Sequence, residues 1–285
     1  MSAPEDAVRQ RVGAGMAGIK PFPRIVLDVL AVLDDEDANA NLLVEHIQRD
    51  PPLTGTLLGM ANSPATRPSG QAVKGVATAV ALLGFARVRA LVTALALREA
   101  FAGAMPEEME SRFWGHSSDV ATAAKTIAEH AGLHPDIAFV AGLLHDIGIL
   151  WIAVNAPDES VRIRALLEAD HTIIDAERRV LGTDHAEIGR VMCAHWGLPE
   201  AIRQAVAGHH NPDALPPDPL MLAVHLAETA CNALDLGGRA RNVIGHVSEA
   251  ALPALGLTWA AMPDLLGEIE ARARFMRTLT GFAPA

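Results

Sequence analysis

Helical periodicity, interrupted at short intervals by proline and glycine, is the feature that most constrains how this chain can fold. Apolar residues recur three and four positions apart along most of the chain, as in residues 39–49, where Leu42, Leu43 and Ile47 share one face. Asp50 and the prolines after it end that stretch. Similar breaks predict a loop over residues 64–70 and, later in the chain, helices over about 135–150 and 241–252 among others. We therefore predict an all-α protein.

The composition also favours helices. Half of the 285 residues are hydrophobic, yet only 4% are aromatic and none is tyrosine. A core built mainly from Ala, Leu, Val and Ile suits packed helices better than a β-sandwich, which favours aromatic and β-branched side chains. A chain of this length can bury a real hydrophobic core in one or two domains.

The distribution of histidine divides the chain. Most of the twelve histidines lie in residues 116–225, and the composition of the chain changes near Met105. We predict an N-terminal helical subdomain over residues 18–105, packed on a His-rich helical subdomain over 106–235. A helical tail over 236–285 completes the chain.

The charge balance bears on the kind of partner. Asp and Glu number 34 against 23 Lys and Arg, for a formal net charge of -11, and no basic stripe is visible. Such a field repels phosphate backbones and anionic membranes, so we expect no direct contact with nucleic acid. The apolar runs are too short to cross a bilayer, no signal peptide is visible, and Cys193 and Cys231 show no CxxC spacing. We expect a cytoplasmic protein with reduced, buried thiols and no membrane contact.

His145 and Asp146 are the first candidates for chemistry, because they lie inside the apolar segment 139–148. Burying an imidazole and a carboxylate there is costly unless they pair or bind something. Side by side, the two groups can supply adjacent nitrogen and oxygen ligands to a divalent ion such as Mn, Fe, Ni, Zn or Mg. The pair is therefore a candidate metal site.

Four further titratable groups lie on the apolar face of their own predicted helices: His116, His185, His209 and Glu228. His210 points about 100° away from His209 on the same helix. A single inward histidine is more often a satisfied core residue than a ligand. Inward groups on successive helices favour one shared polar site, in the way that helical bundles build metal centres. The remaining histidines, among them His195, fit exposed, capping or packing positions, except His225, whose role the pattern leaves open.

The order of these residues is similar to that of the HD phosphohydrolase superfamily: a histidine, a His-Asp pair, a further histidine, two adjacent histidines and an acidic residue. Shorter motifs resemble the HD-related output domain (HDOD) family within it, over about residues 18–235. They are Asp-Pro-Pro-Leu-Thr at 50–54, Ala-Asn-Ser at 61–63, residues 79–89, Phe-Trp-Gly-His-Ser at 113–117, residues 142–148 and Trp-Gly-Leu-Pro at 196–199.

The resemblance implies an HD-like fold for the His-rich subdomain and a bacterial signal-transduction or regulatory role, generally without demonstrated catalysis. It also implies metal ligands, which fall on His116, His145, Asp146, His185, His209 and the neighbouring His210.

Three positions depart from the catalytic members that the chain resembles. Their last ligand is Asp, whereas this chain has Glu228, which is longer but still able to coordinate. Ile149 replaces a Lys that often follows the His-Asp motif. Arg112 lies one turn before His116, where related phosphodiesterases of the HD-GYP type carry a Glu ligand. A cation there would disfavour a second or third metal ion by repulsion.

Two functions are open on this basis. The first is a non-catalytic regulatory module that acts through protein contacts and keeps a degenerate metal pocket. The second is a metal-dependent phosphohydrolase acting on a nucleotide or cyclic dinucleotide, in which the metal would activate water. The missing Lys and Glu favour the first, because fewer groups would neutralise charge on phosphate oxygens. For the protein partner we predict a contact surface on the N-terminal subdomain that includes Arg87 and Arg89. The alternative is that this part of the chain only packs the two subdomains together.

Overall fold

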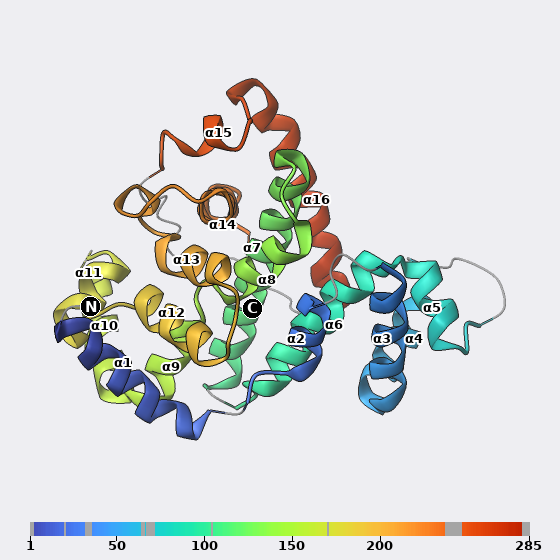
Figure 1. Cartoon of the computed structure of the whole chain (residues 1–285), viewed down its shortest axis with the longest axis horizontal. Helices are drawn as coiled ribbons and strands as arrows, with labels where there is room; N and C mark the ends of the chain where they lie inside the picture. The colour runs from blue at the N-terminus through green and yellow to red at the C-terminus, as the bar shows by residue number, and fades with distance from the viewer. Residues whose placement is uncertain are drawn as a thin grey trace. The chain divides into compact units, whose positions relative to one another are not determined.

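The computed structural model describes residues 3–19, 21–31, 36–63, 66, 72–103, 105–169, 171–236 and 247–280. Every regular element in these ranges is a helix, as Figure 1 shows, and this confirms the all-α prediction. The helices divide into two units. Residues 22–100 form one unit, and residues 1–21 together with 101–285 form the other.

The unit of residues 22–100 has its apolar side chains directed into a core of its own. Its described helices are α2 (Arg24–Ala31), α3 (Glu36–Arg49), α4 (Pro51–Ala61), α5 (Val76–Leu83) and α6 (Phe85–Ala100). Val26, Ile47, Leu57 and Leu91, from four of these helices, are completely buried. The periodicity that predicted the helices therefore also identifies the faces that they bury.

Two polar residues of the 50–54 and 61–63 motifs organise the ends of α4. The Asp50 carboxylate caps the helix by accepting a hydrogen bond from the backbone N–H of Leu53 at 2.9 Å. The side-chain amide of Asn62 exchanges hydrogen bonds with the backbone of Val73 in both directions, at 2.7 and 2.9 Å. These contacts give both motifs a structural role. The predicted loop 64–70 lies, except for residue 66, outside the described residues.

The predicted docking pair follows the bend at Gly84, where α5 and α6 meet at 110° and the glycine takes a φ of 87°. Arg87 is exposed. Arg89 is only 8% exposed, and its guanidinium carbon lies 4.9 Å from the centre of the Phe85 ring. The prediction is corrected for Arg89: its cation packs on an aromatic face inside this unit, which leaves Arg87 as the candidate for partner contact.

The other unit contains the His-rich subdomain and is organised around the 25-residue helix α7 (Glu107–Ala131). Helices α8, α14 and α16 pack against α7, and its Trp114 and Ile127 are completely buried. The remaining helices are α1 (Ala3–Gly15), α8 (Pro135–Leu144), α9 (Ile147–Asn155), α10 (Pro157–Glu168), α11 (Ile173–Leu181), α12 (His185–His195), α13 (Glu200–Gly208), α14 (Pro219–Ala233), α15 (Ala251–Ala254) and α16 (Met262–Thr280). Cys193 and Cys231 are buried and form no disulfide bond, and burial raises the pKa of the Cys193 thiol to about 12.

The two ends of the chain differ from the predicted organisation. The unit boundary between residues 100 and 101 lies close to the predicted one, but residues 1–21 belong with the His-rich unit. Helix α1 was not predicted, because Val8 and Val12 are its only large apolar residues. The tail is part of the same unit, since Nε of Arg277 in α16 donates to the Asp119 carboxylate of α7 at 2.9 Å. The helix predicted near 241–252 falls partly outside the described residues.

Contrary to the expectation that every apolar run is too short, residues 135–155 are long and apolar enough to cross a membrane, but 78% of the most apolar window is buried inside the structure. The segment is also divided into α8 and α9. Helices α5 and α6 satisfy the same length and hydropathy criterion only if they are taken together across their 110° bend. The burial of residues 135–155 is typical of a segment in the core of a folded domain.

Candidate metal centre

His145 and Asp146 lie at a two-residue break between α8 and α9, where the sequence predicted one helix over residues 135–150. The break brings Gly148 against the first residue of α12: a Cβ on Gly148 would lie 2.0 Å from the carbonyl oxygen of His185. Glycine is required for this approach. The continuous helix was therefore wrong, and the break lets α9 and α12 approach closely enough for His185 to reach Asp146.

The Asp146 carboxylate lies at the centre of four imidazoles. Its Oδ1 is 3.2 Å from Nε2 of His185 and 3.5 Å from Nε2 of His209. Its Oδ2 is 3.3 Å from Nε2 of His145 and 3.8 Å from Nε2 of His116. Most of these separations are longer than a normal hydrogen bond. The carboxylate thus faces all four rings rather than pairing with one of them.

His210 and Glu228 complete the group. Nε2 of His210 is 3.0 Å from Nε2 of His185, and its Nδ1 is 3.7 Å from the Glu228 carboxylate. Glu228 also lies 3.9 Å from Nε2 of His209. His210 was expected to point away from His209, but their ring centres are 4.1 Å apart. The two residues follow the end of α13 at Gly208, so the angular spacing of a helix does not apply to them.

All seven predicted ligands therefore meet in one group, which we call the metal cluster: His116, His145, Asp146, His185, His209, His210 and Glu228. They come from α7, the α8–α9 break, the start of α12, the end of α13 and α14.

Backbone carbonyls fix the orientation of two of the rings. Nδ1 of His145 lies 2.7 Å from the carbonyl oxygen of Gly142, and Nδ1 of His209 lies 2.7 Å from that of Val206. In the neutral ring, Nδ1–H donates to its carbonyl, and the unprotonated Nε2 is directed toward Asp146. This is the arrangement that a metal-binding imidazole needs.

Glu177 is a site residue that the sequence analysis did not single out. Its buried carboxylate accepts hydrogen bonds from the backbone N–H of His185 at 2.8 Å and from the Nδ1 of the same residue at 2.7 Å. The contact turns Nε2 of His185 toward Asp146, as a carboxylate behind a metal-binding histidine does. Glu177 lies on the apolar face of α11 with Ile173 and Val180, and this spacing could have identified it.

His225, whose role the sequence left open, supports the metal cluster from outside. Its Nδ1–H donates to the carbonyl oxygen of His209 at 2.6 Å, and its Nε2 accepts from the backbone N–H of Ser248 at 3.1 Å. Both ring nitrogens are therefore used in hydrogen bonds. His225 thus links α14 to His209 and to Ser248 of the C-terminal segment. Because both nitrogens are engaged, it does not act as a ligand in this arrangement.

The pKa values of the metal cluster residues are shifted by burial and by the charges of their neighbours. Burial by itself would lower the pKa of His145 and His185, but the Asp146 carboxylate near His145, and Glu177 with Asp146 near His185, raise both pKa values. Burial would raise the pKa of Asp146, yet the imidazoles hold it well below its usual range. For His210, burial and the neighbouring imidazoles lower the pKa. The raised pKa values of His145 and His185 favour their protonated forms, so a bound cation would have to displace these protons.

The donor set fits a divalent cation. Ligand atoms lie within 4.8 Å of one another in two sets, one of Asp146, His185, His209 and His210 and one of His116, His145 and Glu228. Nε2 of His145 is buried and forms no hydrogen bond with the described residues. A metal ion would satisfy this nitrogen, and imidazole with carboxylate suits Zn, Fe, Ni or Mn better than Mg.

Arg112 does not face the metal cluster. Its side chain is 57% exposed and donates to Glu108, one turn earlier on α7, at 2.7 Å. An exposed, paired guanidinium is screened by water, so the repulsion of a second metal ion that the sequence suggested is not expected to operate.

Comparison with known proteins agrees with this architecture. The family model of the HDOD domain matches residues 19–212. An HDOD domain protein of unknown function from Geobacter sulfurreducens has a TM-score of 0.73 at 24% identity, over 94% of this chain and 98% of that one. A candidate signal transduction protein from Marinobacter aquaeolei VT8 has a TM-score of 0.76 at 21% identity, over 98% of this chain and 66% of that one.

Curated relatives are longer than the region they share with this chain. A protein of Treponema pallidum (strain Nichols) is 23% identical over 223 residues, which are 76% of this chain and 43% of that protein. The chain spans less than half the length of the curated relatives it matches.

Proposed function

Because the chain belongs to the HDOD domain family, we propose that it is a bacterial regulatory module that transmits a signal through protein contacts. In this proposal the metal cluster binds at least one divalent ion and does not turn over a substrate. The module acts in the cytoplasm, and its partner is a protein of a signalling pathway.

Burial of the metal cluster carries the proposal. The side chains of His145, His185 and His209 are 0% exposed, and that of Asp146 is 3% exposed. His210 is the most exposed of the seven, at 25%. A hydrolase must bring a phosphoryl group and a water molecule to an open position on its metal. A set of ligands enclosed by protein is more typical of a metal that holds structure.

A metal ion would be held by the inward nitrogens of the imidazoles and by the Asp146 and Glu228 carboxylates. When bound, it supplies positive charge that several helices share. Because the ligands come from separate helices, binding would stabilise their arrangement and couple metal supply to the folded state. Glu177 and the carbonyl of Gly142 would keep the rings in place.

A metal-dependent phosphohydrolase is the second candidate function, and the convergence of seven ligand-type side chains favours it. Its substrate would be a nucleotide or cyclic dinucleotide, whose phosphoryl group the ion would polarise. Ile149 brings no charge to the position where catalytic members carry Lys, so less stabilisation is available for charge on phosphate oxygens. We therefore expect turnover below about 1 per second.

Metal analysis and a turnover assay separate the two functions. Protein purified without chelator is expected to hold at least one equivalent of Mn, Fe, Ni or Zn and to lose thermal stability on chelation. His145→Ala should lose both properties, whereas His130→Ala should keep them, because His130 is half-exposed and bonded to Glu268. Hydrolysis of a generic phosphodiester or a cyclic dinucleotide above about 1 per second, lost in Asp146→Ala, would contradict the non-catalytic role.

The partner surface is tested with Arg87 alone, because Arg89 is buried. Arg87→Ala is expected to reduce recovery of the partner protein in a pull-down from native cells without changing thermal stability. Arg164→Ala, an exposed arginine of α10, is the control. Equal recovery with both variants and the wild type would exclude Arg87 from the contact.

A further inference from the structure

A pocket of about 290 Å³ lies between α1, α12 and α13, and none of the metal cluster residues lines it. Three arginines from these three helices contribute to its wall: Arg9, Arg190 and Arg203. The other lining residues are Gly13, Met16, Val191, Ala194 and His195. We propose that this arginine pocket binds a small organic phosphate, about the size of a nucleoside monophosphate.

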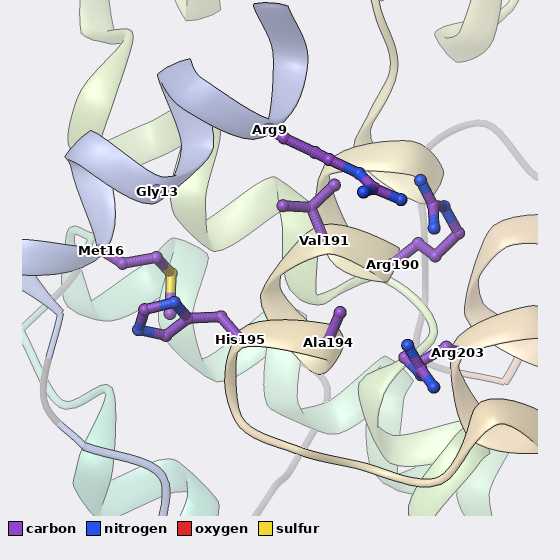
Figure 2. Close-up of a pocket in the computed structure, with 8 residues that line it drawn as sticks. All are labelled: Arg9, Gly13, Met16, Arg190, Val191, Ala194, His195 and Arg203. Carbon is purple, nitrogen blue, oxygen red and sulfur yellow. The ribbon is translucent and has the colours of Figure 1, made fainter. Parts of the chain in front are cut away.

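The side chains divide the pocket into two ends. Figure 2 shows the guanidinium groups of Arg9, Arg190 and Arg203 at one end, and Met16 with His195 at the other. Guanidinium forks match the oxygens of a phosphate, which offers three acceptors where a carboxylate offers two. A thioether and an imidazole ring suit a flat, weakly polar body. The volume is at the lower limit of small-molecule sites, so the ligand is small.

Arg203 is the residue that points most directly to a ligand. It pairs with Glu200 through Nη2, but its Nε is buried and has no hydrogen-bond partner in the part of the chain that the structure describes. A buried donor without an acceptor is costly and uncommon. A phosphate oxygen in the pocket would supply the acceptor.

Glu187 holds a second arginine in position. Arg190 donates to the Glu187 carboxylate from Nε and Nη2, at 2.7 and 2.6 Å. This two-point contact fixes the plane of the guanidinium before a ligand arrives, which reduces the entropy lost on binding. The third arginine, Arg9, comes from α1, a helix that precedes the start of the family match at residue 19. The pocket is thus completed by a segment outside the matched domain.

A simpler account is that Arg190 and Arg203 only form pairs with acids one turn away on their own helices. Calorimetric titration with adenosine monophosphate, carried out in chelator, distinguishes the two accounts. Separate titrations with inorganic phosphate and with adenosine test the two parts of this ligand. We expect adenosine monophosphate to bind with a Kd of about 0.1 mM, phosphate to bind more weakly, and adenosine not to bind.

Variants locate the binding. Arg203→Gln and Arg9→Gln should each weaken it by about tenfold or more, and Arg203→Lys should weaken it too, because lysine keeps the charge but loses the fork. Arg274→Gln is the matched control, because Arg274 is 75% exposed and paired with Glu270 on α16. Melting curves confirm that each variant is folded, and Arg9, which is exposed, provides a test if Arg203 variants unfold.

Several results would overturn the proposal. One is no saturation by adenosine monophosphate up to about 10 mM, and another is equal affinity in wild type and the pocket variants. Adenosine binding as tightly as its phosphate would overturn the role of the arginines, and inorganic phosphate binding equally tightly would overturn the organic part. Adenosine monophosphate is expected to bind equally in chelator and with added Mn²⁺. Binding that requires Mn²⁺ would move the ligand to the metal cluster.

Discussion

Helix α12 contributes residues to both the metal cluster and the arginine pocket. The charged groups of the two sites differ in how far they are buried and in what orients them. His185 begins α12 on its buried side, whereas Arg190 and His195 lie further along it and line the pocket. The groups of the cluster are enclosed by protein and oriented by carbonyls and by Glu177. Those of the pocket are partly exposed, and Arg190 is oriented by the surface carboxylate of Glu187.

Because the two sites differ in burial, substitutions in them should have different effects. Buried charges act on one another with little screening, so losing one leaves the others uncompensated. Exposed charges are screened by water and contribute little to stability individually. Changes in the metal cluster should therefore alter folding, and changes in the pocket should alter ligand binding alone.

Asp146→Ala should have the largest effect. It removes the carboxylate that faces four imidazoles, and breaking a buried ion pair costs ~3–5 kcal/mol. Metal-dependent stabilisation, about 2.7 kcal/mol at 100 times the Kd, should disappear as well. Urea unfolding with and without added metal measures both quantities. Asp158→Ala, at an exposed position of α10, should change little, and equal losses in the two variants would contradict the comparison.

Asp119 is a buried carboxylate outside the metal cluster, and it tests whether burial alone shifts a carboxyl pKa in the same direction as in Asp146. Burial outweighs the Arg277 ion pair and raises the pKa of Asp119 from 3.8 to about 6, the opposite of Asp146. The folded state therefore binds the extra proton, and the free energy of unfolding should fall as pH rises from 3.8 to about 6. Asp119→Asn should remove up to about 3 kcal/mol of this pH dependence. Parallel stability curves for variant and wild type over this range would exclude the shift.

Glu177→Gln should weaken metal binding by about 10- to 100-fold, because the amide holds the His185 ring less firmly than a carboxylate does. Competition with a chromogenic chelator measures the affinity. Glu168→Gln, at an exposed position of the neighbouring helix α10, should leave it unchanged. Unchanged affinity in Glu177→Gln would mean that His185 is oriented by its other contacts.

Arg9→Gln should have the smallest effect on stability. Its side chain is exposed, so the free energy of unfolding should change by less than about 0.5 kcal/mol, and metal content should stay the same. Urea unfolding and elemental analysis check both. A loss above 2 kcal/mol, on the order of a core substitution, would show that the pocket, like the cluster, holds the fold together.

The apolar periodicity of the sequence was enough to predict the buried face of most helices. Inward stripes placed His116, His185, His209 and Glu228 in the core, and the structure brings all four into the metal cluster. The pattern could do this because a polar group among apolar neighbours is costly to bury unless other polar groups meet it. The same reasoning applied to α11 would have added Glu177.

Which of the buried groups contact one another could not be predicted, because it depends on how the helices pack. Gly148 at the helix break allows the start of α12 to approach, and Arg89 packs on Phe85 while Arg87 stays exposed. The arginine pocket likewise forms where α1 meets two helices that are distant in sequence. Spacing along one helix reports its own buried face, but it does not specify the neighbouring helix, because that depends on packing between side chains far apart in the chain.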